Sequence, residues 1–258
     1  MQSDAARGRA FKRIYNIMSY IYDQLKQKAT DTFAAHDLLE ESVRVRARAL
    51  SPEEAIGHPE GDDFPLQKGK ERLMQAEIRG AAGQAFTDQF GDYEGTLGEI
   101  MSMPLRNNYR RAVFIAALNA ALRHLKMIDG SVHCRDQGPG QCAAALAEHI
   151  RKRYGQVKIT QIGFQPVMVG ALSSSFEFRV LDMDVENIGQ RKRGALIEPP
   201  EAVKAAVAWA DLLLVTGTTV VNDTLTDFLG SKPVIFYGTT IAGAAALMGW
   251  ERFCDSST

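Results

Sequence analysis

The sequence has few cysteines, no long apolar run and almost no net charge, and each scarcity excludes a class of protein. Its three cysteines, in 258 residues, are too few and odd in number for a disulfide framework, so we expect a reducing, cytoplasmic compartment. No apolar stretch approaches the ~20 residues that cross a bilayer, and residues 1–13 have no apolar segment typical of a signal peptide. A formal net charge of -1 predicts neither a nucleic-acid partner nor a membrane surface.

Three common enzyme signatures are also missing. No Gly-x-Gly-x-x-Gly occupies the first β-α turn of the C-terminal half, no glycine loop is followed by Gly-Lys-Ser/Thr, and no Gly-x-Ser-x-Gly occurs. The sequence therefore predicts no NAD or ATP site, and it does not indicate a dinucleotide oxidoreductase, a P-loop hydrolase or an esterase.

The hydrophobic pattern divides the chain at a turn-rich segment near residues 128–140. Before it, the pattern predicts a helix in the first forty residues, strands at 42–50 and 72–79, a turn at 80–83 leading into a third strand, and helices at 96–103 and 108–124. After it, the pattern predicts helices at 141–154, 199–210, 220–229 and 241–248, alternating with strands at 158–164, 176–182, 212–216 and 233–237. We therefore expect an α/β protein with an α+β domain at residues 1–128 and a Rossmann-like domain with a parallel sheet at residues 129–258.

Ligands of such sheets bind beyond the carboxyl ends of the strands. Two strand ends carry the same Gly-Thr-Thr sequence, which offers close backbone approach, amides at a helix start and two hydroxyls for an oxyanion. The alternative is that Thr219 and Thr240 only cap their helices. The predicted ligand-binding residues at the strand ends are Gln165, Thr216, Gly217, Thr218, Thr219, Asn222, Gly238, Thr239 and Thr240.

Asp182 and Asp184 follow another strand and, two residues apart on an extended segment, project to the same side. Such a pair could bind a hard cation or ribose hydroxyls. The alternative is that Asp182 caps a turn and Asp184 faces water.

The most specific feature of the sequence is a thiol and imidazole cluster. His133 and Cys134 are adjacent, Cys142 follows after a glycine- and proline-rich turn, and Cys254 could reach the same cleft. Thiolate and imidazole are ligands that transition metals prefer, so His133, Cys134 and Cys142 are candidate metal ligands. The alternative is that the cysteines are small buried hydrophobic residues.

Several segments resemble the "Putative heavy-metal chelation" family of prokaryotic proteins. They are SPEEAIG (51–57), GQAFTD (83–88), ALNA (117–120), VHCRD (132–136), GFQP (163–166), NIG (187–189), TGTTVVN (216–222) and FYGTTIAGA (236–244). The resemblance implies an N-terminal domain similar to that of enolase, a C-terminal Rossmann-like domain and a site between the two. It implies no enolase activity, because the carboxylate set and lysine base of enolase are not recognisable here.

Three functions are compatible with these observations. The first is a metal-handling protein that binds a transition metal, or a metal-bearing small molecule, in the cleft between the domains. Lys68 or Lys70 could close over it, and the favoured alternative is that these lysines lie in an ordinary polar turn. The second is a metal-free enzyme acting on an anionic metabolite, with Cys134 as nucleophile and His133 as base. The third is a ligand-sensing accessory protein whose N-terminal helix docks a partner or a second copy of the chain.

Overall fold

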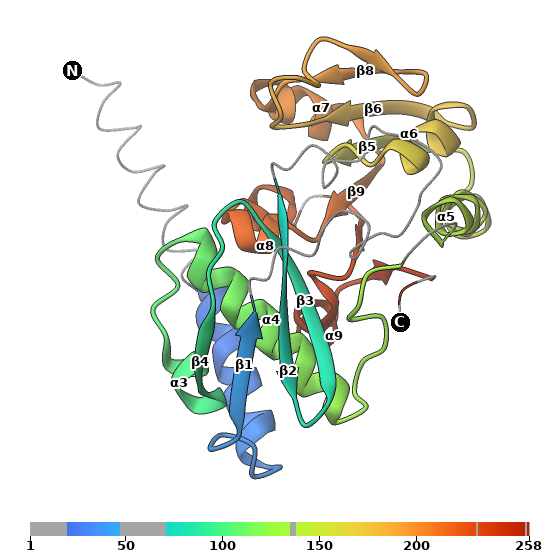
Figure 1. The fold of residues 1–258 in the computed structure, drawn as a ribbon. Coiled ribbons are helices and arrows are strands. Elements are labelled where there is room, and N and C mark those ends of the chain that lie inside the picture. Colours follow the sequence, from blue (N-terminus) through green and yellow to red (C-terminus); the bar gives the residue numbers. More distant parts are fainter. Residues whose placement is uncertain (1–19, 47–70, 135–137, 231, 256, 258) are drawn as a thin grey trace.

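The structure is a computed structural model, and it describes residues 20–46, 71–134, 138–230, 232–255 and 257. These residues form a four-stranded antiparallel sheet and a seven-stranded, mainly parallel sheet, both with helices packed on them (Figure 1). This mixed architecture confirms the predicted α/β class. Within the described ranges, no helix combines the length and the apolar character that crossing a bilayer requires.

The four-stranded sheet has the strand order β3-β2-β1-β4. Val43 and Val45 are buried on one face of β1, whereas Arg44 and Arg46 are exposed on the other, where they lie 3.6 Å from Glu94 and Asp92. The alternating sequence thus produces a sheet with one wet face, as predicted. The strands are β1 (Ser42–Arg46), β2 (Arg72–Ile78), β3 (Ala81–Thr87) and β4 (Tyr93–Thr96).

The seven-stranded sheet has the strand order β11-β10-β9-β5-β6-β8-β7. Adjacent strands in this sheet run parallel to each other, except that β7 runs antiparallel to β8 at one edge. Residues 212–215 of β9 are all buried, because helices cover both faces of this central strand. The strands are β5 (Lys158–Ile162), β6 (Glu177–Leu181), β7 (Arg191–Lys192), β8 (Ala195–Glu198), β9 (Leu212–Thr216), β10 (Val234–Tyr237) and β11 (Arg252–Phe253).

The helices lie against these sheets and between them (Figure 1). Leu212 and Leu214 of β9 belong to the buried cluster that includes α5 and α6, whereas Leu213 and Val215 belong to the cluster that includes α4, α8 and α9. The helices are α3 (Leu97–Ser102), α4 (Asn108–His124), α5 (Gly138–Tyr154), α6 (Pro166–Ser173), α7 (Val203–Trp209), α8 (Thr219–Asn222) and α9 (Ala242–Met248), with a further helix at residues 20–34.

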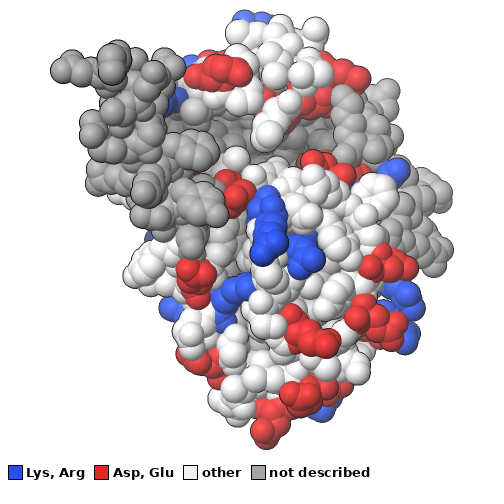
Figure 2. Space-filling view, turned by 90° about the vertical axis from the view of Figure 1, so that its left-hand side faces the viewer, with Lys and Arg blue, Asp and Glu red and all other residues white. Residues whose placement is uncertain are grey.

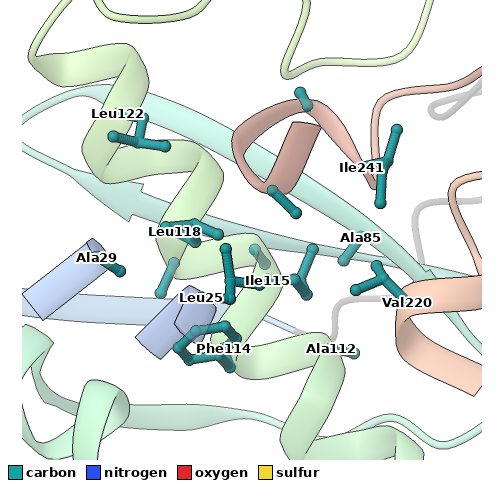
Figure 3. Close-up of a cluster of buried hydrophobic side chains, with 14 of the residues drawn as sticks. Leu25, Ala29, Ala85, Ala112, Phe114, Ile115, Leu118, Leu122, Val220 and Ile241 are labelled. Atoms are coloured by element: carbon teal, nitrogen blue, oxygen red, sulfur yellow. The ribbon is translucent and has the colours of Figure 1, made fainter. Parts of the chain in front are cut away.

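Helix α4 lies at the centre of the molecule. Every residue from Arg111 to Leu122 is buried, so the helix has no face directed to water. Figure 3 shows its side chains between Leu25 and Ala29 of the helix at residues 20–34 and Val220 and Ile241 of the C-terminal half. One apolar cluster therefore joins the two predicted domains through α4.

Gly83 permits the close packing of α4 on β3. A Cβ atom at this position would lie 2.1 Å from the backbone nitrogen of Ala120 and 2.5 Å from the carbonyl oxygen of Ala116. Backbone atoms cannot yield as the end of a flexible side chain can. Only glycine therefore allows the strand and the helix to approach to this distance.

The buried side chain of Asn119 also links the two halves. Its Nδ2 group lies 2.9 Å from the carbonyl oxygen of Gln84 and 3.2 Å from those of Thr239 and Thr240, while its Oδ1 accepts from the Gly243 amide at 2.7 Å. This side chain thus holds β3, α4 and the turn between β10 and α9 together. We call this set of hydrogen bonds the Asn119 clasp.

The predicted elements differ from the structure mainly where elements are short. The predicted helix at 220–229 is instead α8 followed by a 3-10 helix at Leu225–Phe228, because Asp223 adopts a left-handed conformation with φ of 63°. The strand β4, the helix α6 and the hairpin β7–β8 were not predicted. Residues 1–19 of the predicted first helix and 47–50 of the predicted first strand lie outside the described residues.

Candidate functional site

A cavity of about 670 Å³ lies where the strand ends of the larger sheet face the smaller sheet. Its apolar wall includes Phe86, Phe164, Met168 and Phe228. Most of the predicted site residues also line it, namely His133, Cys134, Cys142, Gln165, Asp182, Asp184, Thr216, Gly217, Thr218, Thr219, Asn222, Gly238 and Thr240. Thr239 is buried and is not part of the lining, and Lys70 lies outside the described residues.

The described charged residues of the cavity lining are of one sign. Among the described residues of its lining, five are acidic and none is lysine or arginine. Figure 2 shows the molecule hollowed between its upper and lower parts, with acidic side chains at the edges of the hollow. The acidic lining residues are Glu71, Asp88, Asp182, Asp184 and Asp227. This part of the chain therefore provides a negative surrounding that favours a cation over an anion.

The Gly-Thr-Thr sequence after β10 is occupied by contacts within the protein. Thr240 Oγ1 accepts from the amide of Phe86 at 3.1 Å, and the carbonyl groups of Thr239 and Thr240 belong to the Asn119 clasp. The amide of Gly238 donates to the sulfur of Cys254. These groups of the junction thus hold the two halves and a thiol in place, whereas the hydroxyl of Thr239 is buried without a hydrogen-bond partner among the described residues.

The Gly-Thr-Thr sequence after β9 is partly occupied in the same way. Thr219 Oγ1 donates to the carbonyl of Thr216 at 2.8 Å, and the hydroxyls of Thr216 and Thr218 lie 3.1 Å apart. The amide of Gly217 donates to the carbonyl of Tyr237 at 2.9 Å. The hydroxyls of Thr216 and Thr218 remain at the cavity wall as groups that a ligand can contact.

Asp182 and Asp184 both bind backbone amides. Asp182 accepts from the amides of Phe164 and Asp184, each at 2.6 Å, and Asp184 accepts from the amide of Glu186 at 3.0 Å. Asp182 therefore caps the turn after β6 and fixes it to the end of β5, which is the structural alternative considered above. Both carboxylates still line the cavity.

Glu71 is an acidic residue that sequence reasoning missed. It precedes β2 and lines the cavity. Burial, together with the nearby charges of Asp182, Asp88 and Asp184, raises the pKa of its carboxyl to about 7. Near neutral pH this group therefore exchanges a proton readily, or gains charge when a cation arrives.

The three cysteines of the chain converge on the cavity, although they come from three separate segments. Cys142 in α5 is hydrogen-bonded to Cys254, which follows β11, and Cys134 lies close enough to interact electrostatically with Cys254. Among the described residues, none of the three cysteines forms a disulfide bond. The sequence placed Cys134 and Cys142 near each other and allowed Cys254 to reach the same cleft; the fold adds that Cys254 contacts Cys142 directly.

The thiols differ in acidity. The hydrogen bond from Cys142, assisted by the positive charge of Arg252 and the amide of Gly238, lowers the pKa of Cys254 to about 6 despite its burial. Burial, and the nearby Cys254, raise the pKa of Cys134 to about 12. Cys254 is therefore a thiolate at neutral pH, whereas Cys134 is a thiol.

His133 has the tautomer that suits a metal ligand. Its Nδ1 lies 2.6 Å from the carbonyl oxygen of Cys134, so this nitrogen carries the proton and Nε2 keeps a lone pair. Burial lowers the pKa of the imidazole, which favours the neutral form. The ring also packs edge-on against Phe86, with centroids 5.4 Å apart. Within the described residues, the ring forms its hydrogen bond with the Cys134 carbonyl group and none with the Cys134 sulfur, so the two side chains do not form a nucleophile–base pair.

The fold therefore brings the predicted metal ligands together only in part. Within the described residues, no group of three or more histidine, cysteine, aspartate or glutamate side chains is arranged to hold one metal ion. What the fold does assemble is a bonded pair of thiols, a further thiol and a neutral imidazole in the lining of one cavity.

Comparison with known proteins supports the resemblance described above. The model of the family described as "Putative heavy-metal chelation", DUF364, matches residues 145–248 and confirms the resemblance over that part of the chain. A crystal structure of a protein with unknown function from this family, from Pyrococcus horikoshii, aligns with a TM-score of 0.54 at 18% identity, over 85% of this chain and 79% of that chain. This likeness is one of fold.

A second family structure, from Desulfitobacterium hafniense, aligns with a TM-score of 0.46 at 15% identity, over 69% of this chain and 72% of that chain. The search of curated proteins finds no match.

Proposed function

We propose that this protein binds a metal ion, or a small cation that carries a metal, in the cavity between its two sheets. One observation carries the proposal: all three cysteines reach the lining of a cavity whose described charged residues are acidic. The description of the matching family, heavy-metal chelation, supports the same role.

The chemistry of the lining favours a soft cation. Thiolate and imidazole bind transition and heavy metals better than they bind magnesium or calcium. Among the cysteines, Cys254 is a thiolate at neutral pH and needs no base to become a ligand. His133 presents a neutral ring whose other nitrogen is fixed by a carbonyl group, as is usual for histidine ligands.

The acidic lining also bears on the anionic metabolite considered from the sequence. Two like charges 4 Å apart repel by about 4 kcal/mol at an effective dielectric constant of about 20. An anion at the strand ends would meet the carboxylates of Asp182 and Asp184 without a described lysine or arginine in the lining. We therefore favour a cationic ligand, or a ligand whose metal ion outweighs its negative charge.

A second candidate function is proton transfer to a bound ligand, and Glu71 is the observation that favours it. A carboxyl with a pKa of about 7 in a cavity has the acidity expected of a general acid or base at neutral pH. Cys134 is a poorer candidate for a catalytic nucleophile, because its pKa of about 12 leaves little thiolate at neutral pH.

The test of the proposed function is metal analysis of tag-free protein purified without chelators, followed by calorimetric titration of Cd²⁺ and Zn²⁺. We expect saturable binding that weakens about tenfold at pH 8 in Glu71→Gln, since one negative charge of the lining is lost. Glu77→Gln is the matched control, because Glu77 is exposed on β2. Absence of metal both after purification and after titration would contradict the proposal.

A further inference from the structure

The contact between Cys142 and Cys254 brings two sulfur atoms together in the wall of the cavity. Cys142 lies in the second turn of α5 and is 2% exposed, whereas Cys254 follows the edge strand β11 and is partly exposed. The two residues are 112 positions apart in the chain, and the fold places their side chains in hydrogen-bond contact. Both also line the cavity, so an ion can reach them from it.

The surroundings of the pair include the positive charge of Arg252. The Arg252 guanidinium is held by backbone carbonyl groups, donating to Gly238 at 2.9 Å and to Gly130 at 2.5 Å. In the part of the chain that the structure describes, it forms no ion pair. Its charge therefore acts on the adjacent Cys254 sulfur, to which the amide of Gly238 also donates.

We propose that Cys142 and Cys254 form a two-coordinate site for a monovalent thiophilic cation of the Cu(I) or Ag(I) class. This inference rests on the proposed function and names its ligands and its metal class. On binding at neutral pH, the Cys142 thiol loses its proton to solvent while Cys254 binds as the thiolate it already is; two sulfur–metal bonds form and no electron is transferred. Two thiolates and one monovalent cation give the complex a net charge of -1, and the positive guanidinium of Arg252 offsets this negative charge.

The geometry suits two sulfur ligands better than four. Two sulfurs on opposite sides of an ion lie about twice the metal–sulfur distance apart, and that distance is roughly 2.3 Å for a thiolate on zinc. Sulfurs already in hydrogen-bond contact need only a small side-chain movement to reach such a separation. Structural zinc sites close a tetrahedron of four ligands, whereas linear coordination by two thiolates is common for Cu(I) and Ag(I).

The experiment is an anaerobic titration of the reduced, full-length protein with Cu(I) against a chromophoric Cu(I) chelator. We expect one Cu(I) to bind per chain. In Cys142→Ser and in Cys254→Ser the affinity for Cu(I) should fall by more than about 100-fold. A loss of that size exceeds the loss that is usual when a residue only supports a metal ligand. Glu77→Gln, at an exposed position of β2 outside the cavity lining, is the control and should bind as the unaltered protein does.

A second measurement needs no variant and so does not depend on variant folding. Cu(I) bound to the unaltered protein should protect Cys142 and Cys254, but not Cys134, from a thiol-specific alkylating reagent, as read by peptide mass spectrometry. X-ray absorption should show two sulfur neighbours.

The outcomes separate the inference from the proposed function. Equal protection of all three cysteines, three or four sulfur neighbours, or undiminished Cu(I) affinity in folded Cys142→Ser and Cys254→Ser would overturn the two-thiol site while metal binding in the cavity stands. A protein that takes up neither Cu(I), Cd²⁺ nor Zn²⁺ would overturn both.

Discussion

Replacing Asn119 with alanine should destabilise the protein strongly, because one buried side chain satisfies backbone groups of both halves. The Nδ2 group of Asn119 can donate two hydrogen bonds, shared among the three backbone carbonyl groups near it. Its Oδ1 atom accepts one hydrogen bond from the backbone amide of Gly243. Alanine would leave that amide and the carbonyl groups of Gln84 and Thr240 without the Asn119 side chain, whereas the Thr239 carbonyl still accepts from the Ala242 amide at 3.1 Å. Each buried group left unsatisfied costs about 1–3 kcal/mol, so we expect a total loss of about 3–5 kcal/mol in the free energy of unfolding.

The measurement is urea denaturation followed by circular dichroism, with Asn107→Ala as the matched control. Asn107 is exposed and caps α4, accepting from the Arg110 amide at 2.9 Å. Loss of such a cap costs about 1 kcal/mol. If Asn119→Ala and Asn107→Ala were destabilised equally, the clasp would not hold the two halves together as argued.

Three further predictions concern packing, thiol acidity and the role of Arg252. Gly83→Ala should cost at least about 3 kcal/mol in thermal or urea unfolding, because its Cβ would overlap the α4 backbone. Gly140→Ala, whose Cβ would meet no described atom beyond its own helix and chain neighbours within 4 Å, should be neutral or stabilising by up to about 1 kcal/mol. Alkylation of Cys254 in the metal-free protein should rise with pH around a midpoint near 6, while Cys134 stays unreactive at pH 7. Since folding lowers the pKa of Cys254, its thiolate stabilises the fold above the ordinary cysteine pKa, and this contribution is lost as pH falls through about 6. Arg252→Met should move the alkylation midpoint to higher pH, because a positive charge next to the sulfur is removed; an unchanged midpoint would refute that cause.

The hydrophobic pattern was sufficient to predict the long and central elements. α4 begins and ends at the predicted residues, and β9 was predicted from its continuous apolar run, because length and burial on all sides leave a strong local pattern. The hairpin β7–β8 was missed because its strands are short, and Arg191 and Lys192 resemble an ordinary basic loop. Its turn contains Arg193 and Gly194, both with positive φ.

The site was predictable where a rule of topology applies and not where distant segments meet. Strand ends of a parallel sheet face one side, so residues such as Thr216 and Asp182 could be placed at one cavity from sequence alone. The contact of Cys142 with Cys254 depends on how α5 packs beside β11, which no local pattern encodes. The sequence around Glu71 does not predict its role, since the raised pKa of its carboxyl results from burial and from three aspartates elsewhere in the chain.

The all-round burial of α4 has a practical consequence for dividing the chain. A fragment ending near residue 128 would keep α4 and the small sheet but would lose the cover that α8, α9 and β9 give to the other side of the helix. The exposed strip would be apolar, and such surfaces cause proteins to associate. The two halves should therefore be expressed as a single polypeptide, or as two fragments mixed so that each shields the other.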